Sequence, residues 1–441
     1  MRNICSLIAG AIVVLMLACA CPAQTTQPIT FTHDIAPIVY ADCVSCHRPG
    51  QVAPFSLMSY NDLKKRADQI VTVTQSRYMP PWKPEPGYGD FIGERRLSDE
   101  QIQLISDWKD SGAAEGDAKD LPPMPTFPDG WMLGKPDLIV SMAKPFTLAA
   151  DGDHGRDVYR CFVIPLNFSE NKYVTAVEFH PGNTKIVHHS LFFLDTNGIA
   201  AKREQENTDG QIGYSTFGGP GFTPTGGLGG WAPGAIPTPL PDGWARMLRK
   251  GSDLVIQLHL HPDGKVESEQ SSLGIYFAKE RPTRIVAGAA VRNFLINIPP
   301  GDSDYVVTAQ LKVPVDVDLV GVTPHAHLIC KDMQGNATLP DGKKIPLIWI
   351  KDWDFNWQGQ YMYKTPIRLP AGTVVDMKYT YDNSDANFRN PNNPPKRVHF
   401  GEQTTDEMAF LFLQFSPVNR ADWVRLLADR TFIPRAREGT N

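Results

Sequence analysis

The chain has 441 residues, a formal net charge of −5 and 21% charged residues. At about 150 residues per domain, this length predicts about three domains. The 42% hydrophobic content excludes wholesale disorder, and the mild acidity without a long basic run argues against nucleic acid as a partner. Seven cysteines are too few for a disulfide scaffold, while 36 glycines and 38 prolines predict many turns and β-rich domains.

Residues 1–23 have the pattern of an export signal. Arg2 is the only charge, and an apolar run from Ile8 to Ala18 is followed by small residues. The run is shorter than the roughly 20 apolar residues that a membrane span needs. Two alternatives stay open, which are simple cleavage and a lipid anchor on Cys19 or Cys21, as in bacterial lipoproteins. We therefore expect an exported protein, periplasmic or attached to the cell envelope, that meets a membrane only through such an anchor.

The first predicted domain, residues 24–118, contains the motif Cys-x-x-Cys-His at Cys43, Cys46 and His47. In an exported chain this spacing indicates covalent attachment of one c-type haem, with the histidine as an iron ligand. A zinc ribbon would need a second cysteine pair, and a thioredoxin-like redox pair would need a βαβ context. The sequence has neither pattern, so haem attachment is the favoured interpretation.

The surroundings of this motif predict a small helical domain. The predicted helices are Phe31 to Ala41, Asn61 to Ser76, and Ser98 to Ser111, the last with a capping box of Ser98 and Gln101. Met79 lies in a proline-flanked loop that no helix can occupy, and it is the favoured sixth iron ligand. Met58 is the alternative ligand. The segment resembles the small class I cytochrome c domains, in which such a loop methionine is the distal ligand.

Beyond a proline-rich linker at residues 119–130, the pattern changes to short runs of β-branched and aromatic residues between turn residues. This pattern predicts all-β structure, most simply β-sandwiches. The length allows two domains, residues 131–298 and 299–441, with Ile298-Pro299-Pro300-Gly301 as the seam between them.

The histidines of this β region are grouped. Six of the eleven histidines form three pairs, which are His188-His189, His259-Leu260-His261 and His325-Ala326-His327. On a strand, residues i and i+2 share a face, so each His-x-His can offer two imidazoles to one metal. Adjacent histidines can serve one site only where the strand is twisted or bulged. Imidazole suits copper, zinc, iron and nickel alike, so a zinc hydrolase and a cupin-like iron site stay open at this point.

The segment Thr404-Thr405-Asp406-Glu407-Met408 resembles the methionine-ligand motif of the copper type II, ascorbate-dependent monooxygenases. That family includes peptidylglycine α-hydroxylating monooxygenase and dopamine β-monooxygenase. The His-His pair, the Gln257-x-His259 strand and the His325-x-His327 strand follow in the family's order, and the resemblance covers roughly residues 131–420. The haem domain is an addition to the family's pattern.

The resemblance implies two all-β, jelly-roll-like sandwich domains, here preceded by a small all-α cytochrome c domain, with one copper ion in each sandwich. By position, the electron-donating copper would be bound by His188, His189 and His259. The oxygen-activating copper would be bound by His325, His327 and Met408. His261 matches no ligand in this mapping, and it is the first candidate to replace His259.

The activity implied is insertion of one oxygen atom from dioxygen into a C–H bond of a small-molecule substrate. Two electrons would arrive singly from an external donor, either ascorbate or a redox protein, and the haem would pass them on. A non-enzymatic periplasmic electron-transfer or copper-binding protein is the alternative. A haem-tethered binding module with structural histidines is the third hypothesis.

Three positions depart from the peptide-hydroxylating members of the family. Thr323 stands where they carry an arginine that binds a peptide carboxylate, and Phe410 and Phe412 stand where they present an asparagine and a tyrosine. These departures favour a more apolar substrate over a peptide. The animal enzymes are also rich in disulfides, whereas here only Cys161 and Cys330 could pair, with two buried thiols as the alternative.

Overall fold

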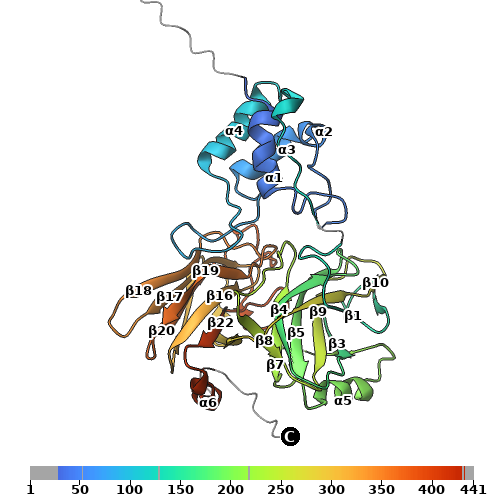
Figure 1. Cartoon of the computed structure of the whole chain (residues 1–441), viewed down its shortest axis with the longest axis vertical. Helices are drawn as coiled ribbons and strands as arrows, with labels where there is room; N and C mark the ends of the chain where they lie inside the picture. Colours follow the sequence, from blue (N-terminus) through green and yellow to red (C-terminus); the bar gives the residue numbers. More distant parts are fainter. Residues whose placement is uncertain (1–27, 52, 128–129, 217–218, 430–431, 433–441) are drawn as a thin grey trace, which may run out of the picture.

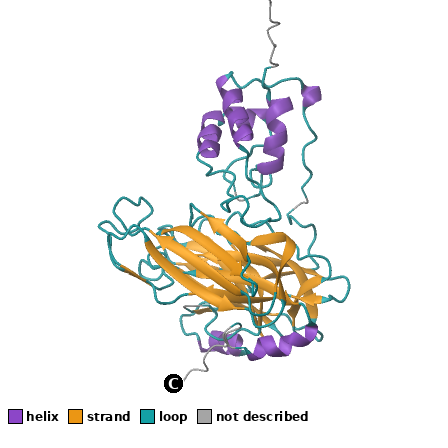
Figure 2. Cartoon of the chain, turned by 90° about the vertical axis from the view of Figure 1, so that its left-hand side faces the viewer, coloured by secondary structure: helices purple, strands orange, loops and turns teal. Residues whose placement is uncertain are grey.

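The structure is a computed structural model that describes residues 28–51, 53–127, 130–216, 219–429 and 432. A helical N-terminal part stands at one end of a larger body of β-strands (Figures 1 and 2). The prediction of a mostly β chain with few helices is confirmed. Within the described ranges, the longest helices are too short or too polar to cross a membrane. The predicted export signal, with Cys19 and Cys21, lies outside the described residues.

The helical part contains all three predicted helices. Its elements are the π-helix η1 (Phe31–Ile35), α1 (Ala36–Asp42), α2 (Tyr60–Lys64), α3 (Ala67–Gln75), α4 (Asp99–Asp110) and the 3-10 helix η2 (Ala118–Asp120). The second predicted helix is divided into α2 and α3, because the backbone of Arg66 leaves the helical conformation. Ser98 and Gln101 form the predicted capping box at the start of α4. Trp108 of α4 is buried in the core of this part and donates its indole N–H to the carbonyl of Ala114 (2.9 Å).

The first β half consists of two five-stranded sheets and a two-stranded one. Its elements are β1 (Leu138–Ser141), β2 (Phe146–Leu148), β3 (Val158–Pro165), β4 (Lys172–His180), β5 (Val187–Asp195), α5 (Ile199–Glu206), β6 (Tyr214–Ser215), β7 (Gly226–Trp231), β8 (Trp244–Leu248), β9 (Asp253–Leu260), β10 (Glu267–Glu269), β11 (Ser272–Phe277) and β12 (Arg284–Ile285). The sheet orders are β1-β11-β4-β8-β12, β6-β3-β9-β5-β7 and β10-β2. Phe192 of β5 and Leu273 of β11 belong to one buried cluster, so the two large sheets share a core.

The second β half has two four-stranded sheets and a two-stranded one. Its elements are β13 (Ala287–Arg292), β14 (Asn297–Ile298), β15 (Tyr305–Lys312), β16 (Val317–His325), β17 (Cys330–Thr338), β18 (Lys344–Ile350), β19 (Tyr361–Leu369), β20 (Val374–Tyr381), β21 (Val398–His399), β22 (Phe410–Pro417), η3 (Arg420–Asp422) and α6 (Trp423–Ala428). The sheet orders are β13-β22-β16-β19, β15-β20-β17-β18 and β14-β21. Met333 of β17 and Leu411 of β22 share the buried core of this half.

The change from the first half to the second comes earlier than the predicted seam. β12 pairs with β8 of the first half, whereas β13 pairs with β22 of the second. Residues 299–301 instead form a turn that leads into β15 within the second half. A Pro-Pro-Gly sequence predicts a turn both between two domains and within one domain. It indicates the local backbone conformation, but not which strands pair on either side of the turn.

Residues 82–94, here called the docking segment, join the helical part to the second half. Phe91 is only 2% exposed, lies in the core of the second half and stacks on Tyr363 with ring centroids 5.0 Å apart. The backbone hydrogen bonds of the segment are Glu85 N–H to Trp349 O (2.7 Å), Ile92 N–H to Met362 O (2.8 Å) and Lys364 N–H to Asp90 O (2.9 Å). The helical part is therefore fastened to β18 and β19 of the second half.

Candidate metal centre

Three histidines of the first half point the same ring nitrogen at one small volume. The Nδ1 atom of His189 lies 3.2 Å from that of His188 and 3.3 Å from that of His259. The three rings are the metal-capable group within the described residues. Two nitrogens held by one metal at about 2.0–2.1 Å in tetrahedral geometry are about 3.3–3.4 Å apart. The two separations at His189 match this value, and the ligand atoms of all three imidazoles lie within 4.8 Å of one another.

A β-bulge explains how adjacent histidines reach the same site. β5 pairs with β9 as Val187↔Leu260 and then His189↔His259, with a shift of register between Val187 and His189. His188 is the extra residue at this shift, so its side chain is not forced to the opposite face of the sheet. Adjacent histidines were expected to share one site only where the strand is twisted or bulged, and β5 has such a bulge.

Asp157, directly before β3, holds two histidines of the first half from behind. Its buried carboxylate accepts hydrogen bonds from His259 Nε2 (2.9 Å), His261 Nδ1 (2.7 Å) and the hydroxyl of Thr404. The ring of His259 also stacks on Tyr159, with centroids 4.3 Å apart. A proton on Nε2 leaves the Nδ1 lone pair of His259 free for a metal.

His261 lies outside the group of three ring nitrogens. β9 ends at Leu260, and the side chain of His261 is 63% exposed, whereas that of His259 is only 2% exposed. His261 contacts the carboxylate of Asp157 and not the Nδ1 atoms of the group. The geometry thus favours His259 over His261 as the third imidazole.

His325 and His327 form a second group at one end of the second half. The sequence predicted both histidines on one strand, but β16 ends at His325, and His327 lies in the connection to β17. The ring centroids are 5.3 Å apart. The Nδ1 of His325 is bonded to Gln358 Oε1 (2.7 Å) and that of His327 to the carbonyl of Asp406 (3.0 Å). Both histidines therefore keep Nε2 free for a ligand.

Glu407 ties the loop of Met408 to the second group. Its buried carboxyl accepts hydrogen bonds from the backbone N–H groups of His327 (2.8 Å), Ile329 (2.8 Å) and Met408 (3.2 Å). Burial raises the pKa of Glu407 to about 8, although these N–H groups oppose the shift. Burial favours the neutral form of Glu407, and backbone N–H groups occupy both of its oxygens, so it is poorly suited as a metal ligand.

The two groups lie against each other across the boundary of the two halves. The rings of His189 and His325 are 6.3 Å apart between centroids. Phe355, in the loop between β18 and β19, stacks on His188 at 4.5 Å and lies 5.6 Å from His327. The sequence predicted two groups in two domains, and the structure places them in one shared region.

Burial keeps the histidines of this region neutral. It lowers the pKa of His188 to about 3, that of His325 to about 4 and that of His327 to about 3. The pKa of His259 is also lowered by burial, although Asp157 opposes the shift. Neutral imidazole is the form that binds a metal, so no proton has to leave before binding at neutral pH.

The Cys-x-x-Cys-His motif forms a turn directly after α1. The carbonyl of Cys43 accepts the N–H groups of Cys46 (3.2 Å) and His47 (2.9 Å). The Nδ1 of His47 is bonded to the carbonyl of Phe55 (3.1 Å), which leaves Nε2 free for iron. Burial raises the pKa of Cys43 to about 12, so this thiol is protonated when nothing is attached to it.

Met79 lines a small cavity between α3 and the start of α4, together with Trp82 and Arg96. Buried guanidinium nitrogens of Arg48, the residue after His47, and the Nη2 atom of Arg96 have no hydrogen-bond partner, while Nε of Arg96 lies 3.6 Å from a carboxylate oxygen of Glu94. Unpaired buried donors are costly, and the two carboxylates of a haem would supply acceptors for them. These arginines and the turn at His47 fit a haem group in this part of the chain.

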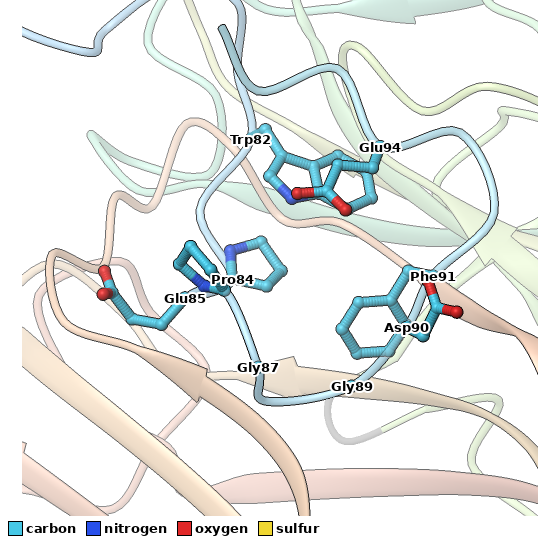
Figure 3. A pocket seen from close by; sticks show the side chains of 9 residues that line it. Trp82, Pro84, Glu85, Gly87, Gly89, Asp90, Phe91 and Glu94 are labelled. Carbon is cyan, nitrogen blue, oxygen red and sulfur yellow. The ribbon is translucent and has the colours of Figure 1, made fainter. Parts of the chain in front are cut away.

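A surface pocket lies in the docking segment and not at the histidines. All nine residues that line it come from positions 82–94 (Figure 3). The acidic residues around it have basic neighbours, in the pairs Glu85–Lys351 (3.0 Å), Asp90–Lys364 (2.8 Å) and Glu94–Arg96 (3.6 Å). The first two pairs join the segment to the second half, whereas Glu94–Arg96 is a local pair.

Cys161 and Cys330 are two buried thiols that lie in different halves, in β3 and β17. Of the alternatives that the sequence left open, the structure has the unpaired one. Sequence reasoning missed four residues that position the histidines, which are Asp157, Phe355, Gln358 and Thr404. Phe355 and Gln358 stand in a loop, where the sequence shows no regular pattern.

No protein-family model matches this chain, and no curated protein matches it. Among solved structures, it is similar to the major capsid protein P2 of bacteriophage PM2, with a TM-score of 0.25 and 7% identity over 64% of this chain and 98% of that chain. It is also similar to PNGF-II, with a TM-score of 0.25 and 12% identity over 72% of this chain and 70% of that chain. Similarity at this level indicates no function, so the function of the chain is inferred from its sequence motifs and from the geometry of the site.

Proposed function

We propose that the chain is an exported haem- and copper-dependent monooxygenase that hydroxylates a C–H bond of a small molecule with dioxygen. Electrons would come from an external donor, ascorbate or a redox protein, through the c-type haem. The observation that carries the proposal is the convergence of the Nδ1 atoms of His188, His189 and His259, next to His325 and His327 of the other half. Within this proposal, the halves are the two jelly-roll-like sandwiches and the helical part is a cytochrome c domain.

The donor set supports copper over a hydrolytic zinc ion. A zinc hydrolase usually adds a carboxylate as ligand or general base. Here Asp157 is engaged in three hydrogen bonds behind His259 and His261, and Glu407 is engaged with three backbone N–H groups. Three imidazoles suit an ion that cycles between Cu(I) and Cu(II), and a thioether such as that of Met408 favours Cu(I).

Bound copper would supply one-electron redox chemistry and the reduction of dioxygen. The chain's own residues fix the rings for this purpose: Asp157 orients His259, and Gln358 orients His325. Phe355, buried between the two groups, limits the access of water to His188 and His327.

The surface beside His325 supports an apolar substrate. Phe410 lies across from His325 in the β16–β22 pairing, and Phe412 lies across from Thr323. Phe410 also contacts Phe294, with ring centroids 5.7 Å apart. An arginine at position 323 would place a charge among these rings, whereas threonine leaves them as an aromatic surface.

Metal analysis of haem-matured protein, with Met408→Ala as the matched variant, tests the proposal. We expect about two coppers and one iron per chain, and loss of one copper or of oxygen reactivity in the variant. The second measurement is anaerobic reduction of the haem, followed by addition of oxygen and candidate substrates.

Haem reoxidation that depends on a substrate would support the monooxygenase. Equal oxygen consumption with and without any substrate of a broad screen would favour the non-enzymatic electron-transfer or copper-binding alternative. A chain that takes up no copper would leave the third hypothesis, a binding module with structural histidines. A Met408→Ala variant with unchanged copper content and oxygen reactivity would contradict the second metal group.

A further inference from the structure

We infer that electrons from the haem-bearing part reach the metal centre at His325 first, through the contact of Tyr78 with Trp357 and through Gln358. The inference rests on the proposed function and concerns the order in which the two histidine groups receive electrons. By the family mapping, the first group, His188, His189 and His259, is the electron-donating one. The contacts of this chain favour the second group as the first acceptor.

From Tyr78 to His325, each step of this route is a direct contact or a covalent connection along the chain. Tyr78 is the neighbour of Met79, the predicted iron ligand, and its ring meets that of Trp357 edge-on with centroids 5.8 Å apart. Trp357 is the neighbour of Gln358, whose Oε1 lies 2.7 Å from Nδ1 of His325. The loop between β18 and β19 therefore touches the haem-bearing part with one residue and the second histidine group with the next.

The contacts toward the first group are less direct. Phe355, two residues before Trp357 in the same loop, stacks on His188 with centroids 4.5 Å apart, which is a van der Waals contact, whereas Gln358, the next residue after Trp357, reaches His325 through a hydrogen bond of 2.7 Å. Arg95 donates a long hydrogen bond of 3.3 Å to the carbonyl of Gly234, and β7, which ends at Trp231, pairs with β5 only beyond His189. The aromatic contacts of the docking segment itself join Trp82 to Tyr361 (5.5 Å), Tyr88 to Trp349 (4.7 Å), and Phe91 to Tyr361 (5.4 Å) and Tyr363 (5.0 Å). None of these contacts includes a histidine.

The electron balance of the step is simple. One electron leaves ferrous haem, which becomes ferric, and it reduces Cu(II) at the second group to Cu(I). No bond is broken and no proton has to move. The first group would then exchange electrons with the second across the short separation of the rings of His189 and His325.

The test follows electron exchange without oxygen or substrate in the haem- and copper-loaded protein. The haem is reduced rapidly, its reoxidation is followed by absorbance, and Cu(II) is followed by electron paramagnetic resonance. We expect Trp357→Leu to slow haem reoxidation by about tenfold or more, with unchanged haem potential and copper content. Tyr78→Leu should act in the same direction, and Tyr78→Phe should restore most of the rate, because it keeps the ring.

Tyr88→Leu is the matched control. Tyr88 makes an equivalent edge-on contact between the docking segment and the second half, with its ring 4.7 Å from that of Trp349, but neither residue neighbours a histidine contact. We expect its rate to stay within about twofold of the wild-type rate. An effect of Tyr88→Leu equal to that of Trp357→Leu would overturn the route, because loosened docking would then explain both.

A second pair of variants tests the order. With the first group disabled by His188→Ala and His189→Ala, the second copper should still be reduced at the wild-type rate. With the second group disabled by His327→Ala, reduction of the first copper should be slowed. Wild-type rates in Trp357→Leu, or in His327→Ala, would overturn the inference alone, whereas no electron exchange in the wild-type protein would overturn the proposed function with it.

Discussion

Asp157→Asn changes a residue that contacts the proposed copper ligand His259 but is not itself a proposed ligand. Asp157 Oδ2 faces His259 Nε2, and Oδ1 faces His261 Nδ1. Burial opposes the charge of Asp157, but the hydrogen bonds from His259, His261 and Thr404 outweigh it and hold its pKa well below the usual value. The carboxylate is therefore an anion that keeps the proton of His259 on Nε2.

Asparagine offers one oxygen and one NH₂ group in the same space. If the oxygen faces His259, the hydrogen bond survives without its charge. If the NH₂ faces His259, the ring proton must move to Nδ1, the atom that points at the metal. Loss of such a partner lowers metal affinity by about 10- to 100-fold, which corresponds to about 1.4–2.7 kcal/mol.

The assay is a copper titration against a competing chelator, with the second group as the internal reference. We expect the affinity of the first group to fall by the stated factor and that of the second to stay the same. Thr404→Val, which removes one of the three hydrogen bonds, should give a smaller loss. An affinity of the first group within about twofold of wild type in Asp157→Asn would refute the assignment of Asp157 as the residue that fixes His259.

Three further changes have separate readouts. Met408→Ala should weaken Cu(I) binding at the second group and leave the first unchanged, as measured by chelator competition under reducing conditions. Phe91→Ala should destabilise the second half by about 3–5 kcal/mol in denaturant unfolding, because it empties a buried site, and it should expose the docking segment to protease. Asp209→Asn should destabilise the fold at pH 7, because the hydrogen bond to buried Arg160 lowers the pKa of Asp209 to about 2. Because the pKa of Asp209 is lower in the folded state, its carboxylate stabilises the folded protein fully only above the unfolded-state pKa of about 4. The difference in unfolding free energy between wild type and Asp209→Asn should therefore shrink as the pH falls from 4 to 2. Denaturant unfolding at both pH values would check this.

Short-range signals in the sequence were sufficient for the local structure. The capping box at Ser98 and the alternating β-branched runs act within a few residues, and the structure has the corresponding helix and strands. The pairing of His188 and His189 required a bulge, which depends on how β5 meets β9. The sequence could state that condition, but not whether it was met, because the register of two strands depends on the whole sheet.

Long-range partners had no such signal. Asp157 lies 102 positions before His259, and Thr404 lies 247 positions after Asp157. A single aspartate before a strand is common and indicates no particular role. Only the folded structure shows that Asp157 contacts the imidazole ring of His259. The burial of Phe91 in another part of the molecule was equally invisible, because a single phenylalanine in a glycine-rich loop has no periodic pattern.

The segment from Thr404 to Met408 shows why a motif can be recognised before its parts are understood. Its resemblance to a methionine-ligand motif accounts for Met408 alone. In the structure, the hydroxyl of Thr404 contacts Asp157 behind the first group, while the carbonyl of Asp406 and the carboxyl of Glu407 both bind His327 of the second. Polar residues that are not ligands therefore hold both histidine groups from one short stretch of chain. Thr404 belongs to the second half and its hydroxyl contacts Asp157 of the first half. The same stretch of chain therefore also helps to fix how the two halves meet at the proposed metal centre.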